Sequence, residues 1–229
     1  MGFGSALLDL LFPPRCAFCG KVTDEAPDGI CPGCREGLPR SGTEKRKADF
    51  VRSVTAPLYY EGVVREALLR YKFHYTPVRG RIFGRMIGEE LLRRGETDFD
   101  VITWVPLSRE RKRRRGYDQA SILAEAAAEV LGKETVPLLR KVRNAPPQSG
   151  IRTPEARRAN VSGCYVVPDP SLAEGKSILL IDDIITTGAT VSECARMLML
   201  SGAEKVRAAS LAVRRHEKRP LEPYEVTDI

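Results

Sequence analysis

The stretch Ile178-Leu-Leu-Ile-Asp-Asp-Ile-Ile-Thr-Thr-Gly-Ala-Thr190 decides the fold. Its first four residues form a continuous apolar run, as expected of a strand buried on both faces. Two carboxylates follow, Asp182 and Asp183, and then a loop of small residues that leads into a helical pattern. A strand that runs through a polar loop into a helix is the unit from which parallel α/β sheets are built.

This loop suits a phosphorylated ligand that also carries a diol. In open α/β sheets, ligands bind beyond the carboxyl ends of the strands, and backbone N–H groups at a helix N-terminus favour phosphate. Gly188 allows close approach of the backbone, whereas the two carboxylates suit the hydroxyls of a ribose. The residues expected to bind this ligand are Asp182, Asp183, Thr186, Thr187, Gly188, Ala189 and Thr190.

Residues 178–190 resemble the signature with which type I phosphoribosyltransferases bind 5-phosphoribosyl-1-pyrophosphate (PRPP). The resemblance implies that PRPP binds together with Mg²⁺. Asp182 and Asp183 would then hold the ribose hydroxyls and the hydration shell of the metal. The alternative is an ordinary strand-to-helix turn with capping residues, which explains the threonines and the glycine but not two adjacent acids after a buried strand.

Outward from this motif, apolar segments with strand and helix periodicity alternate along the chain. This order predicts an α/β domain over residues 50–215, with a mostly parallel sheet of the type I phosphoribosyltransferase kind and helices on both faces. Strands are expected near 51–60, 101–105, 136–139, 164–167, 177–181 and 206–213, and helices over 62–73, 81–94, 118–131 and 191–200.

Four cysteines near the N-terminus, Cys16, Cys19, Cys31 and Cys34, form the pattern C-x₂-C-x₁₁-C-x₂-C. Two such pairs can bring four thiolates to one tetrahedral ion, for which Zn²⁺ is the usual choice. Disulfides and an iron–sulfur cluster are the alternatives. Four thiolates would leave no open position on the zinc, so the site is predicted to be structural. Cys164 and Cys194 are isolated and are interpreted as small buried residues.

Residues 1–40 are predicted to form a unit of their own, a short N-terminal helix followed by a small zinc ribbon, with a linker over residues 40–49. The chain of 229 residues has a net charge of +7 and a pI near 9.2, which favours polyanionic ligands. No apolar run approaches the ~20 residues of a membrane span, and the first residues lack the basic start of a signal peptide. The expected location is therefore the cytoplasm, where cysteines stay reduced.

A second anion-binding loop is predicted after the strand at 101–105. Six of the seven residues from 109 to 115 are basic, and arginine forks bind pyrophosphate well. The same charge could instead contact nucleic-acid phosphates or form a solvated helix face. The residues expected to hold pyrophosphate are Pro106, Leu107, Ser108, Arg109 and Arg115.

The cysteine pairs, Val105-Pro-Leu107, Arg113-Arg-Arg-Gly-Tyr-Asp-Gln-Ala120 and the Asp-Asp/Thr-Thr-Gly motif together resemble the ComF family of competence proteins. Tyr117 and Asp118 stand where that family more often has Phe and Asn. The resemblance also implies a hood that closes over the substrate, contributed by Gln148, Arg152, Arg158 and Asn160, for which an ordinary surface loop is the alternative.

Two functions follow from these features. In the first, a PRPP-binding protein handles incoming single-stranded DNA during natural transformation, with single-stranded DNA and DNA-uptake proteins as partners; the ComF resemblance alone implies this role. In the second, the protein is an active phosphoribosyltransferase that uses PRPP and Mg²⁺. Thr186 stands where purine-salvage members of this fold carry an acid, which disfavours a purine base as the acceptor.

Overall fold

The computed structural model describes residues 13–23, 26, 28–42, 48–73, 76–143 and 159–215. Among these residues, no helix is both long and apolar enough to span a membrane. In chain order the elements are α2 (Pro32–Gly37), β1 (Val54–Thr55), β2 (Leu58–Tyr59), α3 (Gly62–Phe73), α4 (Pro77–Arg94), β3 (Val101–Trp104), α5 (Arg109–Arg115), α6 (Gln119–Leu131), β4 (Glu134–Thr135), β5 (Arg140–Lys141), β6 (Tyr165–Val166), the 3₁₀ turn η2 (Pro170–Leu172), β7 (Ser177–Ile185), α8 (Ala189–Leu200) and β8 (Lys205–Val213).

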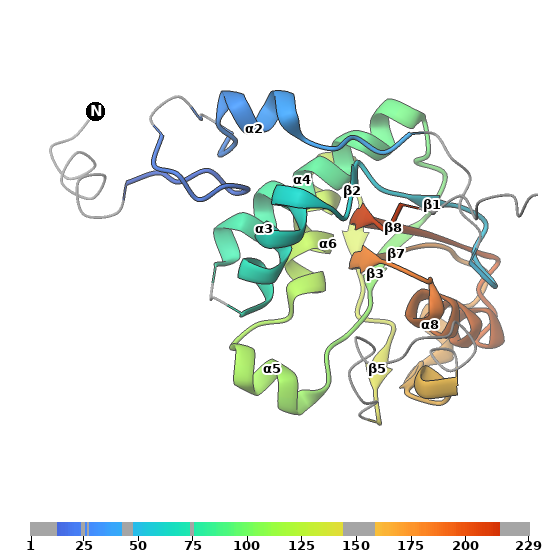
Figure 1. Cartoon of the computed structure of the whole chain (residues 1–229). Coiled ribbons are helices and arrows are strands. Elements are labelled where there is room, and N and C mark those ends of the chain that lie inside the picture. The colour runs from blue at the N-terminus through green and yellow to red at the C-terminus, as the bar shows by residue number, and fades with distance from the viewer. Residues whose placement is uncertain are drawn as a thin grey trace, which may run out of the picture.

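The central sheet has the strand order β1-β8-β7-β3-β4, and β2 also pairs with β8. Every pairing in this sheet is parallel, so the predicted fold class is confirmed. The carboxyl ends of β3, β7 and β8 therefore lie at one edge of the sheet, with β7 between the other two (Figure 1). Ligand-binding loops are expected at this edge.

Helices cover both faces of the sheet. Helices α4 and α6 pack against each other and against β3, β7 and β8, whereas α8 packs against β6, β7 and β8 on the other side (Figure 1). Two hydrophobic clusters correspond to these two faces. The first includes Leu179 and Ile181 of β7, and the second includes Ile178 and Leu180. Alternate residues of β7 thus point to opposite faces, as the period of a strand requires.

Strand β7 is longer than predicted. The sequence placed its end at Ile181, but the strand pairs with β8 as far as Ile185 and contains both aspartates. The alternation along β7 consequently separates the two carboxylates. Asp183 lies on the side of α3 and α6, and Asp182 lies on the side of α8 and β5.

Close packing of α4 on α6 depends on glycines that face α6. A Cβ atom on Gly84 would lie 2.5 Å from the carbonyl oxygen of Leu123, and one on Gly88 would lie 2.9 Å from the Cβ of Val130. These distances leave no room for a side chain. The helical periodicity predicted α4, but not that its glycines form the contact surface.

The strand predicted at 136–139 is wrong in its position. Residues 134–135 and 140–141 form the short strands β4 and β5, and the residues between them have no strand assignment. Pro137 has no N–H group to donate and so interrupts the ladder. Val136 N still donates to Ile102 O at 2.8 Å. Strand β5 then pairs with β6 in a separate antiparallel ribbon.

Candidate functional site

The four N-terminal cysteines converge as the spacing predicts. Their sulfur atoms all lie within 4.8 Å of one another, and the Sγ atoms of Cys19 and Cys31 are 3.7 Å apart. A tetrahedral zinc site with Zn–S bonds of about 2.3 Å requires sulfur–sulfur distances of about 3.8 Å. All six cysteines of the chain are free of disulfides. The donor set and its geometry therefore fit a structural zinc ion.

Cys16 is the thiol that this fold most readily keeps as a thiolate. Burial raises its pKa, but the backbone N–H groups of Cys31, Cys19 and Phe18 outweigh burial and lower the pKa to about 6. One of these donors, Cys31 N, lies 3.4 Å from the Cys16 sulfur. Hydrogen bonds from backbone N–H groups to sulfur prepare a thiolate for a metal ion.

The ribbon is packed into the main hydrophobic core. Phe18, between the first two cysteines, is fully buried, and its ring centre lies 5.2 Å from that of Phe83 on α4. Arg70 of α3 donates to the Phe18 carbonyl. The buried residues of the ribbon share one cluster with α3, α4 and α6. A zinc ion bound by the four cysteines therefore stabilises a ribbon that packs directly against α3 and α4.

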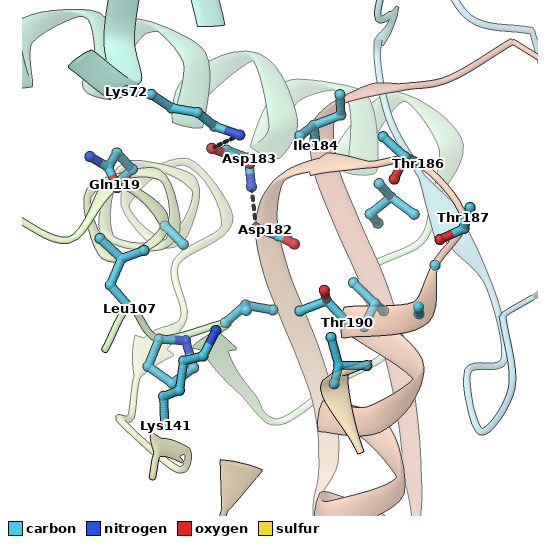
Figure 2. Close-up of a pocket in the computed structure, with 18 of the residues that line it drawn as sticks. Lys72, Leu107, Gln119, Lys141, Asp182, Asp183, Ile184, Thr186, Thr187 and Thr190 are labelled. Carbon is cyan, nitrogen blue, oxygen red and sulfur yellow. Dashed lines mark hydrogen bonds and ion pairs between the residues drawn. The ribbon is translucent and has the colours of Figure 1, made fainter. Parts of the chain in front are cut away.

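A cavity of about 590 Å³ opens at the carboxyl edge of the sheet, and Figure 2 shows part of its wall. All seven residues predicted to bind PRPP line this cavity. The structure also brings together basic side chains from several elements on the same wall. These are Arg65, Lys72, Arg111, Arg115, Lys141 and Arg214, against three acidic side chains, Asp118, Asp182 and Asp183.

The Thr-Gly loop has the backbone geometry of a phosphate cradle. Gly188 is the N-cap of α8 with φ of +78°, in the left-handed region, and no side chain caps the helix. The first N–H groups of α8 consequently have no partner within the helix. Figure 2 shows Thr186 and Thr187 on the loop and Thr190 on the first turn of α8, around one end of the cavity.

The two aspartates have different partners. The Asp183 carboxylate forms an ion pair with the Lys72 amine at 2.9 Å, and the two side chains are only 13% and 24% exposed. The Asp182 carboxylate accepts a hydrogen bond from the backbone N–H of Asp183 at 2.8 Å. Figure 2 shows Lys72 reaching Asp183 from one side of the cavity, while Lys141 approaches from the other.

The surroundings of Asp182 and Lys72 also determine whether these two side chains carry a proton. Burial, and next the negative charge of Asp183, raise the pKa of Asp182 to about 8. Burial lowers the pKa of Lys72, but the charge of Asp183, its hydrogen bond to the amine and the charge of Asp182 together outweigh burial and leave that pKa above its usual value. Lys72 is therefore a cation at neutral pH, whereas Asp182 titrates near neutrality.

The predicted pyrophosphate loop is only partly in the cavity. Pro106, Leu107 and Arg115 line it, but Ser108 is buried and caps α5, accepting from Arg111 N at 3.3 Å. Arg109 is exposed and is not among the lining residues. Arg111, two residues further along α5, lines the cavity in its place.

Lys141 of β5 completes this side of the cavity. Its amine donates to the Tyr165 hydroxyl at 3.1 Å across the β5–β6 ribbon. Burial, and next the positive charge of Arg111, lower the pKa of Lys141. Two cations that face each other across a partly buried space favour an anion between them. No motif surrounds Lys141 in the sequence, so the sequence does not predict a role for it.

Asp118 holds the loop after β3 in place. Its Oδ2 accepts from the backbone N–H of Leu107 at 3.0 Å, and burial raises its pKa. An asparagine at this position could accept the same hydrogen bond through its amide oxygen. The Asp in place of the more usual Asn is thus compatible with this structural role.

The predicted hood lies mostly outside the described residues. Gln148, Arg152 and Arg158 are among the residues of which the structure gives no description. Asn160 is described, and its carbonyl accepts a long contact from the Cys164 thiol at 3.6 Å. Its neighbour Val161 lines the cavity.

Comparison with known proteins agrees with both parts of this description. Residues 115–228 match the family model of the phosphoribosyl transferase domain, and residues 7–45 match that of the double zinc ribbon domain. The competence protein ComFC of Streptococcus pneumoniae is 30% identical over 207 residues, which cover 86% of each chain. ComFC of Bacillus subtilis is 30% identical over 208 residues, covering 86% of this chain and 81% of that one. The DNA utilization protein YhgH of Salmonella typhi is 25% identical over 207 residues, with 84% and 87% covered.

Proposed function

The chain belongs to the family of the ComFC competence proteins, and on that premise we propose that it binds PRPP at the carboxyl end of β7 and acts in the handling of single-stranded DNA. One observation carries the PRPP assignment. The Thr-Gly cradle, Asp182 and a cluster of basic side chains line the same cavity. A phosphate, a diol and a pyrophosphate are the groups that these three features recognise.

The proposed binding mode follows the walls of the cavity. The 5-phosphate lies on residues 186–190, where the N–H groups of α8 begin. The ribose hydroxyls donate to the aspartates, chiefly to Asp182. The pyrophosphate lies toward β3, against the loop of Pro106 and Leu107 and the side chains of Arg111, Arg115 and Lys141. Ser108 orients α5, and Arg109 stands outside the wall.

Mg²⁺ suits this site as a companion of PRPP. It prefers oxygen ligands and usually keeps several waters, so Asp182 and Asp183 would hold its hydration shell. When bound, the ion would neutralise charge on the leaving pyrophosphate. The chain itself would orient the ribose, and the predicted hood residues Gln148, Arg152, Arg158 and Asn160 would exclude water from the reacting carbon. These features support transfer of the phosphoribosyl group to a small acceptor as the alternative function.

The zinc ribbon and the transferase-like domain are assigned to residues 1–40 and 50–215. We place the protein in the cytoplasm, where reducing conditions keep the four thiols available for zinc. Thr186 leaves the loop without the acid that would serve a purine base. This disfavours a purine base as the acceptor of a transfer reaction.

Calorimetric titration of the zinc-loaded protein with PRPP and Mg²⁺ tests the pocket. We expect saturable binding. At a pH above about 8, where Asp182 is ionised, we expect Asp182→Asn to weaken it by at least about tenfold, because an amide accepts more weakly than a carboxylate from ribose hydroxyls. Absence of binding by folded wild-type protein would refute the assignment.

The same titration should depend on pH. Asp182 has a raised pKa and must lose its proton to accept fully from the ribose and from hydrated Mg²⁺. The affinity for PRPP should therefore rise as the pH increases from 6.5 to about 8 and then level off. Below about pH 8, the binding of PRPP should release a proton from Asp182. Titration in two buffers of different ionisation enthalpy measures this release. The Asp182→Asn variant should keep only the pH dependence of PRPP itself.

The DNA-handling role has support from helix α5. Arg113 and Arg114 are exposed on a helix in which six of seven residues are basic. The Arg113→Ala/Arg114→Ala double variant should lose affinity for single-stranded DNA and show a salt slope smaller by about 1.4, since each phosphate contact contributes about 0.7. Fluorescence anisotropy at several salt concentrations measures it. Lys176→Ala, exposed at the opposite end of β7, is the control, and an unchanged slope in the double variant would exclude α5 as the contact.

A further inference from the structure

We propose that Lys72 is a further ligand-binding residue of the cavity. Its amine supplies, beside Asp182 and Asp183 (the acid pair), a part of the positive charge that Mg²⁺ otherwise brings with PRPP. The inference rests on the proposed function. It adds to the proposed site a residue from helix α3, which lies outside the signature at 178–190. It also implies that PRPP binding depends less on the metal than it would without Lys72.

Lys72 is shielded from solvent and paired with one of the two aspartates, unlike the exposed cations of the cavity. Its amine lies 2.9 Å from Asp183, and both side chains are largely shielded from solvent. Arg65 and Arg214, by contrast, belong to exposed residues. A shielded charge is screened much less by salt than an exposed one. Lys72 therefore acts on a bound anion at short range and with little attenuation.

Helix α3 holds Lys72 rigidly at this position. The preceding residue, Tyr71, is fully buried and donates through its hydroxyl to the Gln119 carbonyl at 2.8 Å. Tyr117 donates to the Tyr71 carbonyl, and the Tyr71 ring packs edge-on against Phe83 at 5.7 Å. These contacts join the end of α3 to α4 and α6. The backbone of Lys72 is thus fixed before any ligand arrives.

The charge balance at the acid pair explains what a cation does there. Asp183, and Asp182 once it has lost its proton, stand beside the cradle for a phosphate, so their negative charge opposes the binding of a polyanion. Lys72 compensates Asp183 and leaves a hydrogen-bonding surface that carries less negative charge. A divalent cation bound with the ligand would provide the same compensation. The Lys72–Asp183 ion pair therefore supplies, within the protein, a part of the charge compensation that a bound metal ion would supply.

Titration calorimetry with PRPP, once in excess Mg²⁺ and once in EDTA, tests the inference. Zinc content is checked before and after, because the chelator must not strip the ribbon. We expect Lys72→Met to raise the Kd in EDTA by at least about tenfold and the Kd in excess Mg²⁺ by no more than about threefold. Lys72→Arg keeps the charge and should restore most of the metal-free affinity.

Lys205→Met is the matched control. Lys205 also pairs with an aspartate, Asp98, at 2.6 Å, but at the beginning of β8 and away from the cavity. The Lys205→Met variant removes the same net charge as Lys72→Met. It should leave the Kd for PRPP unchanged both in excess Mg²⁺ and in EDTA.

Three outcomes would overturn the inference. One is a Lys72→Met variant that binds like wild type, and another is an equal loss of affinity with and without Mg²⁺. The third is an equal loss in Lys72→Arg and Lys72→Met, which would make the effect structural. In all three the wild type still binds PRPP and the proposed function stands. Failure of the wild type to bind PRPP even with Mg²⁺ would refute the proposed function and this inference together.

Discussion

Cys34→Ser protein is expected to lose its zinc, to unfold at a temperature lower by about 10 °C and to bind PRPP more weakly. A structural zinc site needs all four thiolates, and binding of the ion is itself folding energy for a small ribbon. Loss of the ion frees Phe18 from its contact with Phe83, and removal of such a buried ring costs about 3 to 5 kcal/mol. Zinc content by mass spectrometry and thermal unfolding measure both effects.

A chain of side-chain contacts explains why loss of the zinc ion should weaken PRPP binding. Phe18 packs on Phe83, Phe83 packs on Tyr71, and Tyr71 precedes Lys72. Loosening of the ribbon should therefore reach the acid pair through the end of α3. Cys164→Ser is the control, since Cys164 is buried on the other face of the sheet and outside the ribbon. A Cys34→Ser protein with full zinc, or with unchanged stability, would contradict the structural role of the site.

The convergence of residues 182–190 on one cavity and that of the four cysteines could be predicted because the residues of each group are close together in the sequence. Consecutive residues at a strand-to-helix turn have few geometries open to them, and two C-x₂-C pairs have a defined reach. The parallel sheet could be predicted for a similar reason, since apolar strands that alternate with helices leave few arrangements. The structure confirms the sheet and the convergence of the cysteines.

Lys72 and Lys141 could not be predicted in this way. Each reaches the cavity from an element distant in the sequence, and a single lysine in a helix or short strand carries no pattern. The separation of Asp182 from Asp183 was open to prediction, however. Had β7 been extended through the acids, the period of two would have placed them on opposite faces. The basic run misled at Arg109 because helix α5 turns that residue away from the cavity, while Arg111 faces it.

Gly188→Val should reduce the affinity for PRPP by at least about a hundredfold, because it changes the backbone of the phosphate cradle itself. Gly188 has φ of +78°, where a β-branched residue is strongly strained. Its new Cβ would also lie 3.2 Å from the Cβ of Ala48. Relief of both conflicts requires the loop to move, and the N–H groups at the start of α8 would then no longer point at one phosphate.

Gly175→Val separates this effect from backbone strain in general. Gly175 has φ of +66° and open space around it, and it lies in the turn before β7, at the opposite end of the strand from the cavity. Both variants should lose stability from strain, by about 1 to 2 kcal/mol. Only Gly188→Val should lose PRPP, as measured by calorimetry on protein shown to be folded. If Gly188→Val bound PRPP as wild type does, residues 186–190 would not be the phosphate cradle, and the 5-phosphate would have to lie among the basic side chains on the β3 side of the cavity.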